Sequence, residues 1–166
     1  MNANIRKAEL ADAQAIATIY NYYIENTTVT YETELITTEE MARRIKEISE
    51  KYPYLVYEEK GKVVAYCYAH PWRTRAAFLH TLETSIYLDH TIKHHGIGTK
   101  LVTELIEMLK RQGYHALIAT ITNENTESIA FHLRLGFKQV GQYEQVGWKF
   151  DRWIGLNSYE MILGGQ

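Results

Sequence analysis

The segment KHHGIGTKLVTELIEMLKRQG, residues 93–113, constrains the fold more than any other part of the chain. It contains Gly96 and Gly98 at the start of an amphipathic pattern that predicts a helix over residues 97–112, and Gly113 ends that pattern. Glycines in a first turn let a ligand approach the backbone closely, and the free N–H groups of that turn attract phosphate. The segment therefore predicts either a diphosphate-binding turn or simply a tight connection from a strand into a helix.

The patterns on either side predict a mixed α/β fold. Apolar residues at helical spacing indicate four helices, with Asp12 and Thr38 as N-caps of the first two; their ranges are 11–24, 38–50, 97–112 and 125–136. Alternating or continuous apolar runs indicate strands at 4–10, in a hairpin over 54–72, and at 76–89, 115–122, 137–147 and 148–163. Residues 25–36 read as an irregular loop. This order implies a mixed sheet with one parallel crossover, through the helix at 97–112.

Length and composition favour a single domain over residues 1–166 in a cytoplasmic protein. The chain has no Pro/Gly/Ser linker, no signal-peptide pattern and no apolar run of ~18 residues that would span a membrane. A net charge of -2 argues against nucleic acid or an anionic membrane as a partner. The single cysteine, Cys67, lies in an apolar run, which favours a buried structural thiol over a reactive one. The 13 tyrosines, against 4 phenylalanines, suggest half-exposed aromatic positions at a groove or a subunit interface.

Three consecutive motifs resemble one known superfamily. The strand LETSIYL, residues 82–88, leads into KHHGIG, and NTESIAFHLRLGF follows at 125–137. They resemble the GCN5-related N-acetyltransferase (GNAT) superfamily, whose [RQ]-x-x-G-x-[GA] loop holds the coenzyme A pyrophosphate; Lys93 stands where Arg or Gln is usual. The resemblance implies a central, mixed, mostly antiparallel twisted sheet of about seven strands flanked by about four helices. It also implies acetyl-CoA as cosubstrate, and as cofactor-binding residues Ile86, Tyr87, Leu88, Lys93, His94, His95, Gly96, Ile97, Gly98, Thr99, Asn125 and Ser128.

Within that superfamily the chain resembles the phosphinothricin and methionine sulfoximine acetyltransferase group. The likeness lies in IYNYYIENTTVTYE (19–32), PWRTRAAFLHTLETSIYL (71–88) and GWKFDRW (147–153). Gly155 departs from it, standing where that group usually has Asp, and His80 stands where an aromatic is common. The resemblance implies acetyl transfer to the α-amino group of a small amino acid or analogue, a homodimer, and as substrate-binding residues Tyr31, Arg73, Arg75, Lys149 and Trp153.

The chemistry of this transfer indicates roles for several side chains. An alkyl amine is mostly protonated at pH 7, so a base must accept its proton, and Glu83 is the candidate unless it only forms a salt bridge. His132 stands where many superfamily members have a catalytic Tyr; it would donate to the coenzyme A sulfur or order a water, unless it only packs or caps. Arg73 and Arg75 would share a face if they lay on a strand, and would then grip a carboxylate or phosphinate together; otherwise they are solvated loop residues.

Two other functions compete with this one. The chain could be a non-catalytic coenzyme A-binding sensor module, but such a module needs no base beside the loop. It could instead acetylate proteins or peptides, although the arginine pair favours a small acidic acceptor. The remaining histidines, at 70, 90 and 115, are too scattered to form a metal-ligand motif.

Overall fold

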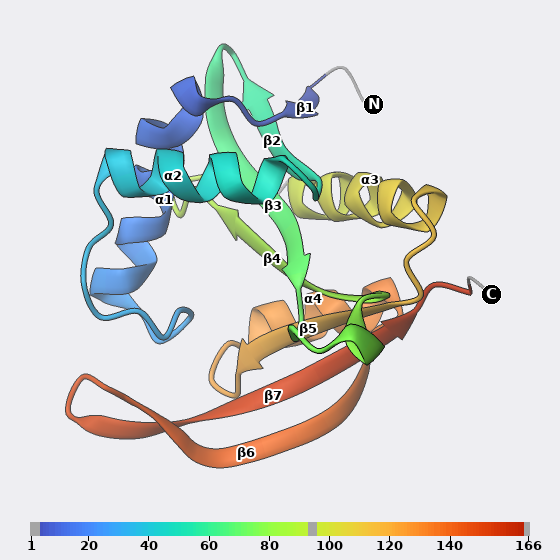
Figure 1. Ribbon diagram of the computed structural model, residues 1–166. Helices are drawn as coiled ribbons and strands as arrows, with labels where there is room; N and C mark the ends of the chain where they lie inside the picture. The colour runs from blue at the N-terminus through green and yellow to red at the C-terminus, as the bar shows by residue number, and fades with distance from the viewer. Residues whose placement is uncertain (1–3, 93–95, 165–166) are drawn as a thin grey trace.

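The computed structural model describes residues 4–92 and 96–164. One sheet of seven strands runs through the molecule in the order β1-β2-β3-β4-β5-β7-β6 (Figure 1). Its strands are β1 (Ile5–Lys7), β2 (Tyr54–Glu59), β3 (Lys62–Pro71), β4 (Thr81–Leu88), β5 (Ala116–Thr122), β6 (Lys138–Lys149) and β7 (Arg152–Ile162). The helices are α1 (Ala13–Asn26), α2 (Thr38–Ser49), α3 (Ile97–Arg111) and α4 (Thr126–Leu135), with short 3₁₀ turns η1 (Leu10–Asp12) and η2 (Ala76–Phe78). The predicted mixed sheet with flanking helices is confirmed.

Two apolar clusters form the core, one on each face of the sheet. Because successive strand side chains point to opposite faces, Leu55 joins the cluster beneath α3 while Val56 joins the cluster beneath α1 and α2. In the same way, Cys67 joins the cluster beneath α3 and Tyr66 joins the cluster beneath α1 and α2. Cys67 is fully buried, as predicted for a structural thiol. The sheet is therefore held rigid on both sides up to β4.

The pairing between β4 and β5 fixes where a site can form. It is the one parallel pairing among the described strands, and it extends over only three residue pairs, ending at Glu83↔Ile118. Beyond that pair β4 continues to Leu88 and β5 to Thr122 without contact between them in the sheet. The predicted parallel crossover through α3 is thus confirmed, and the sheet opens at its end.

Several local predictions were wrong for identifiable reasons. The strand expected over 76–89 begins only at Thr81, because residues 76–78 form a 3₁₀ turn. The last two strands meet at Phe150 and Asp151, three residues after the expected boundary. Both residues adopt the positive φ that a tight hairpin requires, 52° and 55°, without the glycine or asparagine that usually marks such a turn.

The N-caps of α1 and α2 also differ from those predicted. Thr37, not Thr38, caps α2: its hydroxyl accepts a hydrogen bond from the N–H of Glu40. The Asp12 carboxylate binds the Arg6 guanidinium and the N–H of Glu9 instead of capping α1. Among the described residues no helix is both long and apolar enough to cross a lipid bilayer.

Replacing Thr37 by Ala should lower the free energy of unfolding by about 1 kcal/mol, because an orphan N–H of the first turn of α2 loses its acceptor. Thr38→Ala is the matched control, since the Thr38 hydroxyl only bonds the exposed side chain of Gln14. Urea denaturation of both variants measures the difference. An equal loss for the two substitutions would contradict the assignment of the cap.

Candidate active site

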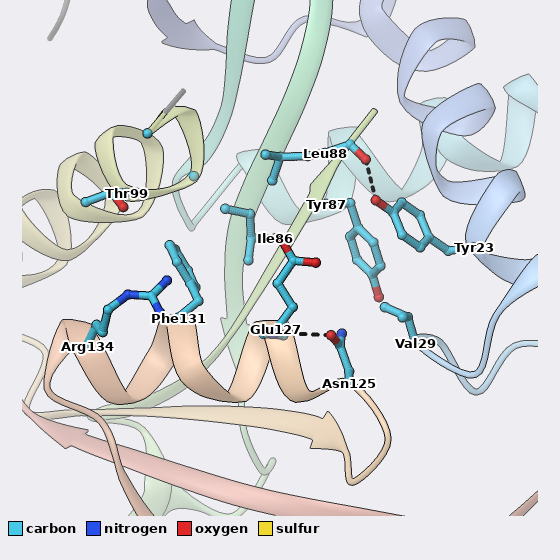
Figure 2. Close-up of a pocket in the computed structure, with 13 residues that line it drawn as sticks. Tyr23, Val29, Ile86, Tyr87, Leu88, Thr99, Asn125, Glu127, Phe131 and Arg134 are labelled. Carbon is cyan, nitrogen blue, oxygen red and sulfur yellow. Dashed lines mark hydrogen bonds between the residues drawn. The ribbon is translucent and has the colours of Figure 1, made fainter. Parts of the chain in front are cut away.

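A cavity of about 360 Å³ opens where β4 and β5 separate (Figure 2). Its walls come from the end of β4, the first turn of α3, one side of α4, and two residues that lie far away in the sequence. The lining residues are Tyr23, Val29, Ile86, Tyr87, Leu88, Gly96, Gly98, Thr99, Asn125, Glu127, Ser128, Phe131 and Arg134. The structure thus brings eight of the twelve residues predicted for cofactor binding to one cavity.

The first turn of α3 presents bare backbone to this cavity. Gly96 is the N-cap residue with φ 74°, and as a glycine it has no side chain to accept a hydrogen bond from the first N–H groups. A Cβ added at Gly98 would lie 3.5 Å from the Phe131 ring and 3.7 Å from Ile86, so it would fill the space beside the turn. Such a turn fits a diphosphate, which needs free donors and close approach. Ile97 is buried in the core, so only its backbone can face a ligand.

Three further residues of the predicted cofactor loop, Lys93, His94 and His95, lie outside the described residues. Among residues 4–92 and 96–164, no cluster of three or more His, Cys, Asp or Glu side chains could hold a metal ion.

Helix α4 begins at the cavity because Asn125 caps it. The Asn125 side chain accepts from the N–H of Ser128 at 3.1 Å, which fixes the first turn. Sequence reasoning missed Glu127, Phe131 and Arg134, although their helical spacing after Asn125 would have indicated one face of the helix. It also missed Tyr23 and Val29, for which the sequence carries no local signal.

A smaller cavity of about 50 Å³ continues between the separated strands and reaches His132. His132 is buried, and its Nδ1 donates to the Ser128 carbonyl at 2.8 Å, because a carbonyl oxygen can only accept. Burial lowers the pKa of the imidazole, which favours the neutral ring. A neutral ring with a proton on Nδ1 has a lone pair on Nε2. His132 is therefore arranged to accept a hydrogen bond. The sequence had instead suggested that it donates one to the coenzyme A sulfur.

Glu83 lies at the last paired position of β4, immediately before the residues that line the small cavity. It is half-buried and stands opposite His70 on β3 and Ile118 on β5. Within the described part of the chain, no ion pair includes Glu83. The structure places a carboxylate without a salt bridge at the base of the opening.

The predicted substrate residues Tyr31 and Lys149 come together beside the β6–β7 hairpin. The Tyr31 hydroxyl donates to the Gly155 carbonyl at 2.6 Å. Lys149 is buried, which lowers the pKa of its ammonium group, and its Nζ donates to the Thr30 carbonyl at 2.9 Å. A Cβ at Gly147 would lie 2.8 Å from the Tyr31 ring, so that position needs glycine. Trp153 lies further along the hairpin and is 55% exposed.

The two predicted substrate arginines do not lie on a strand. β3 ends at Pro71, and residues 72–75 form no regular structure. Arg73 and Arg75 are both exposed, and the Arg73 guanidinium lies 4.5 Å from the centre of the Trp72 ring. The expected strand geometry for this pair was wrong, because the chain turns away from the sheet after Pro71.

Comparisons with known proteins agree with this architecture. The family model described as "Acetyltransferase (GNAT) domain" matches residues 5–157. Phosphinothricin N-acetyltransferase of Streptomyces viridochromogenes is 35% identical over 94% of this chain and 85% of its own. The L-methionine sulfoximine/L-methionine sulfone acetyltransferase of Pseudomonas aeruginosa is 37% identical over 98% of this chain and 96% of its own. A phosphinothricin acetyltransferase from Sinorhizobium meliloti, solved in complex with AcCoA, superposes with a TM-score of 0.93 and 36% identity, covering 99% of this chain and 90% of that one.

The sheet that opens between β4 and β5, with a bare helix start beside the opening, is the architecture of an acetyltransferase. The chain belongs to the GNAT acetyltransferase family.

Buried His132 should titrate below the ordinary histidine pKa of about 6.5, because burial disfavours the charged ring. The unfolded chain then binds a proton that the folded ring rejects. The contribution of His132 to folding stability is therefore fully present above about pH 6.5. It is lost as the pH falls from there through the folded pKa of the ring. Imidazole NMR titration measures the pKa, and urea unfolding at two pH values measures the loss. A pKa at or above 6.5 would contradict the buried neutral ring.

Proposed function

We propose that residues 1–166 form a single N-acetyltransferase domain that transfers acetyl from acetyl-CoA to the α-amino group of a small amino acid or analogue. The observation that carries this proposal is the opening between β4 and β5, which has the bare start of α3 at one end and Glu83 at the other. Phosphinothricin, methionine sulfoximine and methionine sulfone are the leading acceptors, because relatives at 35% and 37% identity bear their names. The predicted cytoplasmic location stays a prediction.

The donor would be held by residues at the two cavities. The N–H groups at the start of α3 would bind its diphosphate, with Lys93, His94 and His95 as predicted cationic neighbours. The predicted contacts Ile86, Tyr87, Leu88, Asn125 and Ser128 line the walls from there to the small cavity. Acetyl-CoA, when bound, supplies an acetyl thioester.

Glu83 would act as the general base. Directly or through a water it takes a proton from the ammonium group of the acceptor, and the freed amine nitrogen forms a bond to the acetyl carbon. Beyond Glu83, β4 has no β5 partner on one side, so its backbone N–H groups there can stabilise the oxyanion. The C–S bond then breaks, and the thiolate takes up the second proton, which the acceptor nitrogen loses as the amide forms.

His132 would position the coenzyme A sulfur or a water beside it. Its neutral ring offers Nε2 as an acceptor to the small cavity, where it can hold the thiol product or a water through a hydrogen bond. The carboxylate, phosphinate or sulfoximine end of the acceptor would lie against the predicted substrate residues, which are Tyr31, Arg73, Arg75, Lys149 and Trp153.

Glu83→Gln should reduce kcat/KM for the acceptor at least about a hundredfold, because an amide cannot take the amine proton. The dissociation constant for acetyl-CoA should stay within about twofold of wild type, since the start of α3 is unchanged. Thiol release measured against methionine sulfoximine, methionine sulfone, phosphinothricin, ordinary amino acids, polyamines and peptides tests both the base and the acceptor class.

Glu160→Gln is a matched control for that experiment. Glu160 on β7 and Glu83 on β4 both stand opposite Ile118 of β5. The Glu160→Gln substitution therefore removes a carboxylate from the same row of the sheet. Full turnover by Glu83→Gln would exclude the base. Donor binding without turnover of any amine would favour the sensor module, and turnover of peptides alone would favour a protein acetyltransferase.

The β6–β7 hairpin supports the homodimer that was predicted from the resemblance. Figure 1 shows the hairpin extending beyond the rest of the sheet. It carries a group of large apolar side chains that are at least half exposed: Val140, Tyr143, Val146, Trp148, Phe150 and Trp153. Burial of this group against a second copy would remove their apolar surface from water. The hairpin is the surface that we propose for the subunit interface.

Trp148→Lys should weaken the dimer at least about tenfold, because a charge would enter an apolar interface. Leu10→Lys is the matched control: Leu10 is 54% exposed, as Trp148 is, but lies in η1 outside the hairpin. Sedimentation velocity over a concentration series measures both. A monomeric wild-type chain, or an equal effect of the two substitutions, would contradict the hairpin interface.

A further inference from the structure

Besides its hydrogen bonds to α1 and α2, the loop between these helices has three ties to the C-terminal half of the chain. The Thr28 hydroxyl donates to the Glu124 carboxylate at 2.6 Å. The Thr30 carbonyl accepts from Lys149, and Tyr31 donates to the Gly155 carbonyl. Between these ties, Val29 lines both the large and the small cavity. The segment 28–31 therefore forms a wall that separates the donor cavities from the hairpin.

Glu124 is the residue at which three separate parts of the chain meet. It lies in the connection from β5 to α4, directly before the helix cap Asn125. Besides Thr28, its carboxylate binds both terminal nitrogens of Arg152, at the start of β7, with Nη2 at 2.8 Å from Oε2. These hydrogen bonds, chiefly from Arg152, lower the pKa of Glu124 to about 2, so the carboxylate is charged at neutral pH.

We propose that Glu124 is a positioning residue that holds segment 28–31 closed between the donor cavities and the acceptor site. This inference rests on the proposed function. Neither catalysis nor donor binding explains why a carboxylate stands at this point, whereas its three hydrogen bonds join the loop, the start of α4 and the hairpin. The Glu124 and Arg152 side chains are 38% and 50% exposed. A pair this exposed adds little to folding stability, so we expect it to act mainly on the position of the loop.

Opening of this segment has two consequences for the reaction. Tyr31 moves away from the acceptor, which weakens acceptor binding. Val29 leaves the wall of the cavities, and water can then reach the donor thioester. A water oxygen bonds to the acetyl carbon, the C–S bond breaks, and acetate and the coenzyme A thiol are released. Acetyl-CoA itself stays bound, because the start of α3 is not part of the tie.

Thr28→Val tests this proposal, because it removes the hydroxyl from a buried residue while nearly keeping its shape. Loss of a hydrogen bond to a charged group should raise the acceptor KM by about tenfold. Acceptor-independent thiol release should rise, and the dissociation constant for acetyl-CoA should change less than twofold. Glu124→Gln should act in the same direction, whereas Thr28→Ser, which keeps the hydroxyl, should restore wild-type behaviour.

Arg43→Ala is the matched control. Arg43 forms equally exposed ion pairs with Glu40 and Glu47 on α2, away from both cavities, so its loss should change neither KM nor thiol release. The proposal is overturned if acceptor-independent thiol release in Thr28→Val equals that of wild type. It is also overturned if acetyl-CoA binding weakens as much as acceptor binding, as a general loosening of the fold would cause.

Hydrogen exchange separates this proposal from the proposed function. In Thr28→Val with acetyl-CoA bound, the backbone amides of residues 28–32 should exchange faster than in wild type or Thr28→Ser. This readout needs no acceptor, so it remains decisive even if no amine is acetylated. Unchanged exchange would exclude a role of the Thr28–Glu124 hydrogen bond in holding the segment. Faster exchange in a protein that acetylates no amine would support that role and exclude the proposed reaction.

Discussion

The end of parallel pairing at Glu83 is the constraint on which the site depends. β4 and β5 pair over three positions and then separate, so one edge of each strand is left without a partner inside the protein. Unpaired backbone groups in a sheet are costly unless water or a ligand satisfies them. The crossover through α3 and the connection to α4 bring two helix starts to this same gap. A single interruption of the sheet thus creates both the space for a ligand and the donors that bind it.

The two faces of the sheet contribute differently to this arrangement. Beneath α3 the core is mostly aliphatic and packs the helix against β2, β3 and β4. Beneath α1 and α2 it contains tyrosines, among them Tyr20, Tyr54 and Tyr66, and burial raises the pKa of all three. The abundance of tyrosine had suggested half-exposed positions, yet Tyr54 and Tyr66 stack on each other in the core and Tyr20 packs edge-on against Tyr87. Composition alone could not distinguish the two outcomes, because a tyrosine is buried wherever its ring finds packing partners and its hydroxyl a hydrogen bond.

Local signals predicted most of the fold and part of the site. Periodicity located all four helices, the glycines of the α3 turn pointed to one wall of the cavity, and Asn125 was indicated only by the family resemblance. Local sequence patterns gave no correct prediction where contacts between residues far apart in the sequence, or an unusual backbone conformation, decide the structure. Tyr23 and Val29 reach the cavity only because α1 packs beside β4. The turn at 150–151 uses positive φ without glycine, and the arginines at 73 and 75 follow a strand that ends at a proline.

The contacts around segment 28–31 link features that the sequence keeps far apart. Two of its ties go directly to β6 and β7, a third reaches β7 through Glu124 and Arg152, and a fourth joins the Thr30 and Tyr20 hydroxyls. The hairpin therefore helps to set the position of the loop, and the loop carries Val29 into the walls of both cavities. If the exposed apolar side chains of the hairpin are covered by a second subunit, as proposed, the same covering would steady the loop. Subunit association and closure of the acceptor site would then stabilise each other, because both depend on one hairpin being held in place.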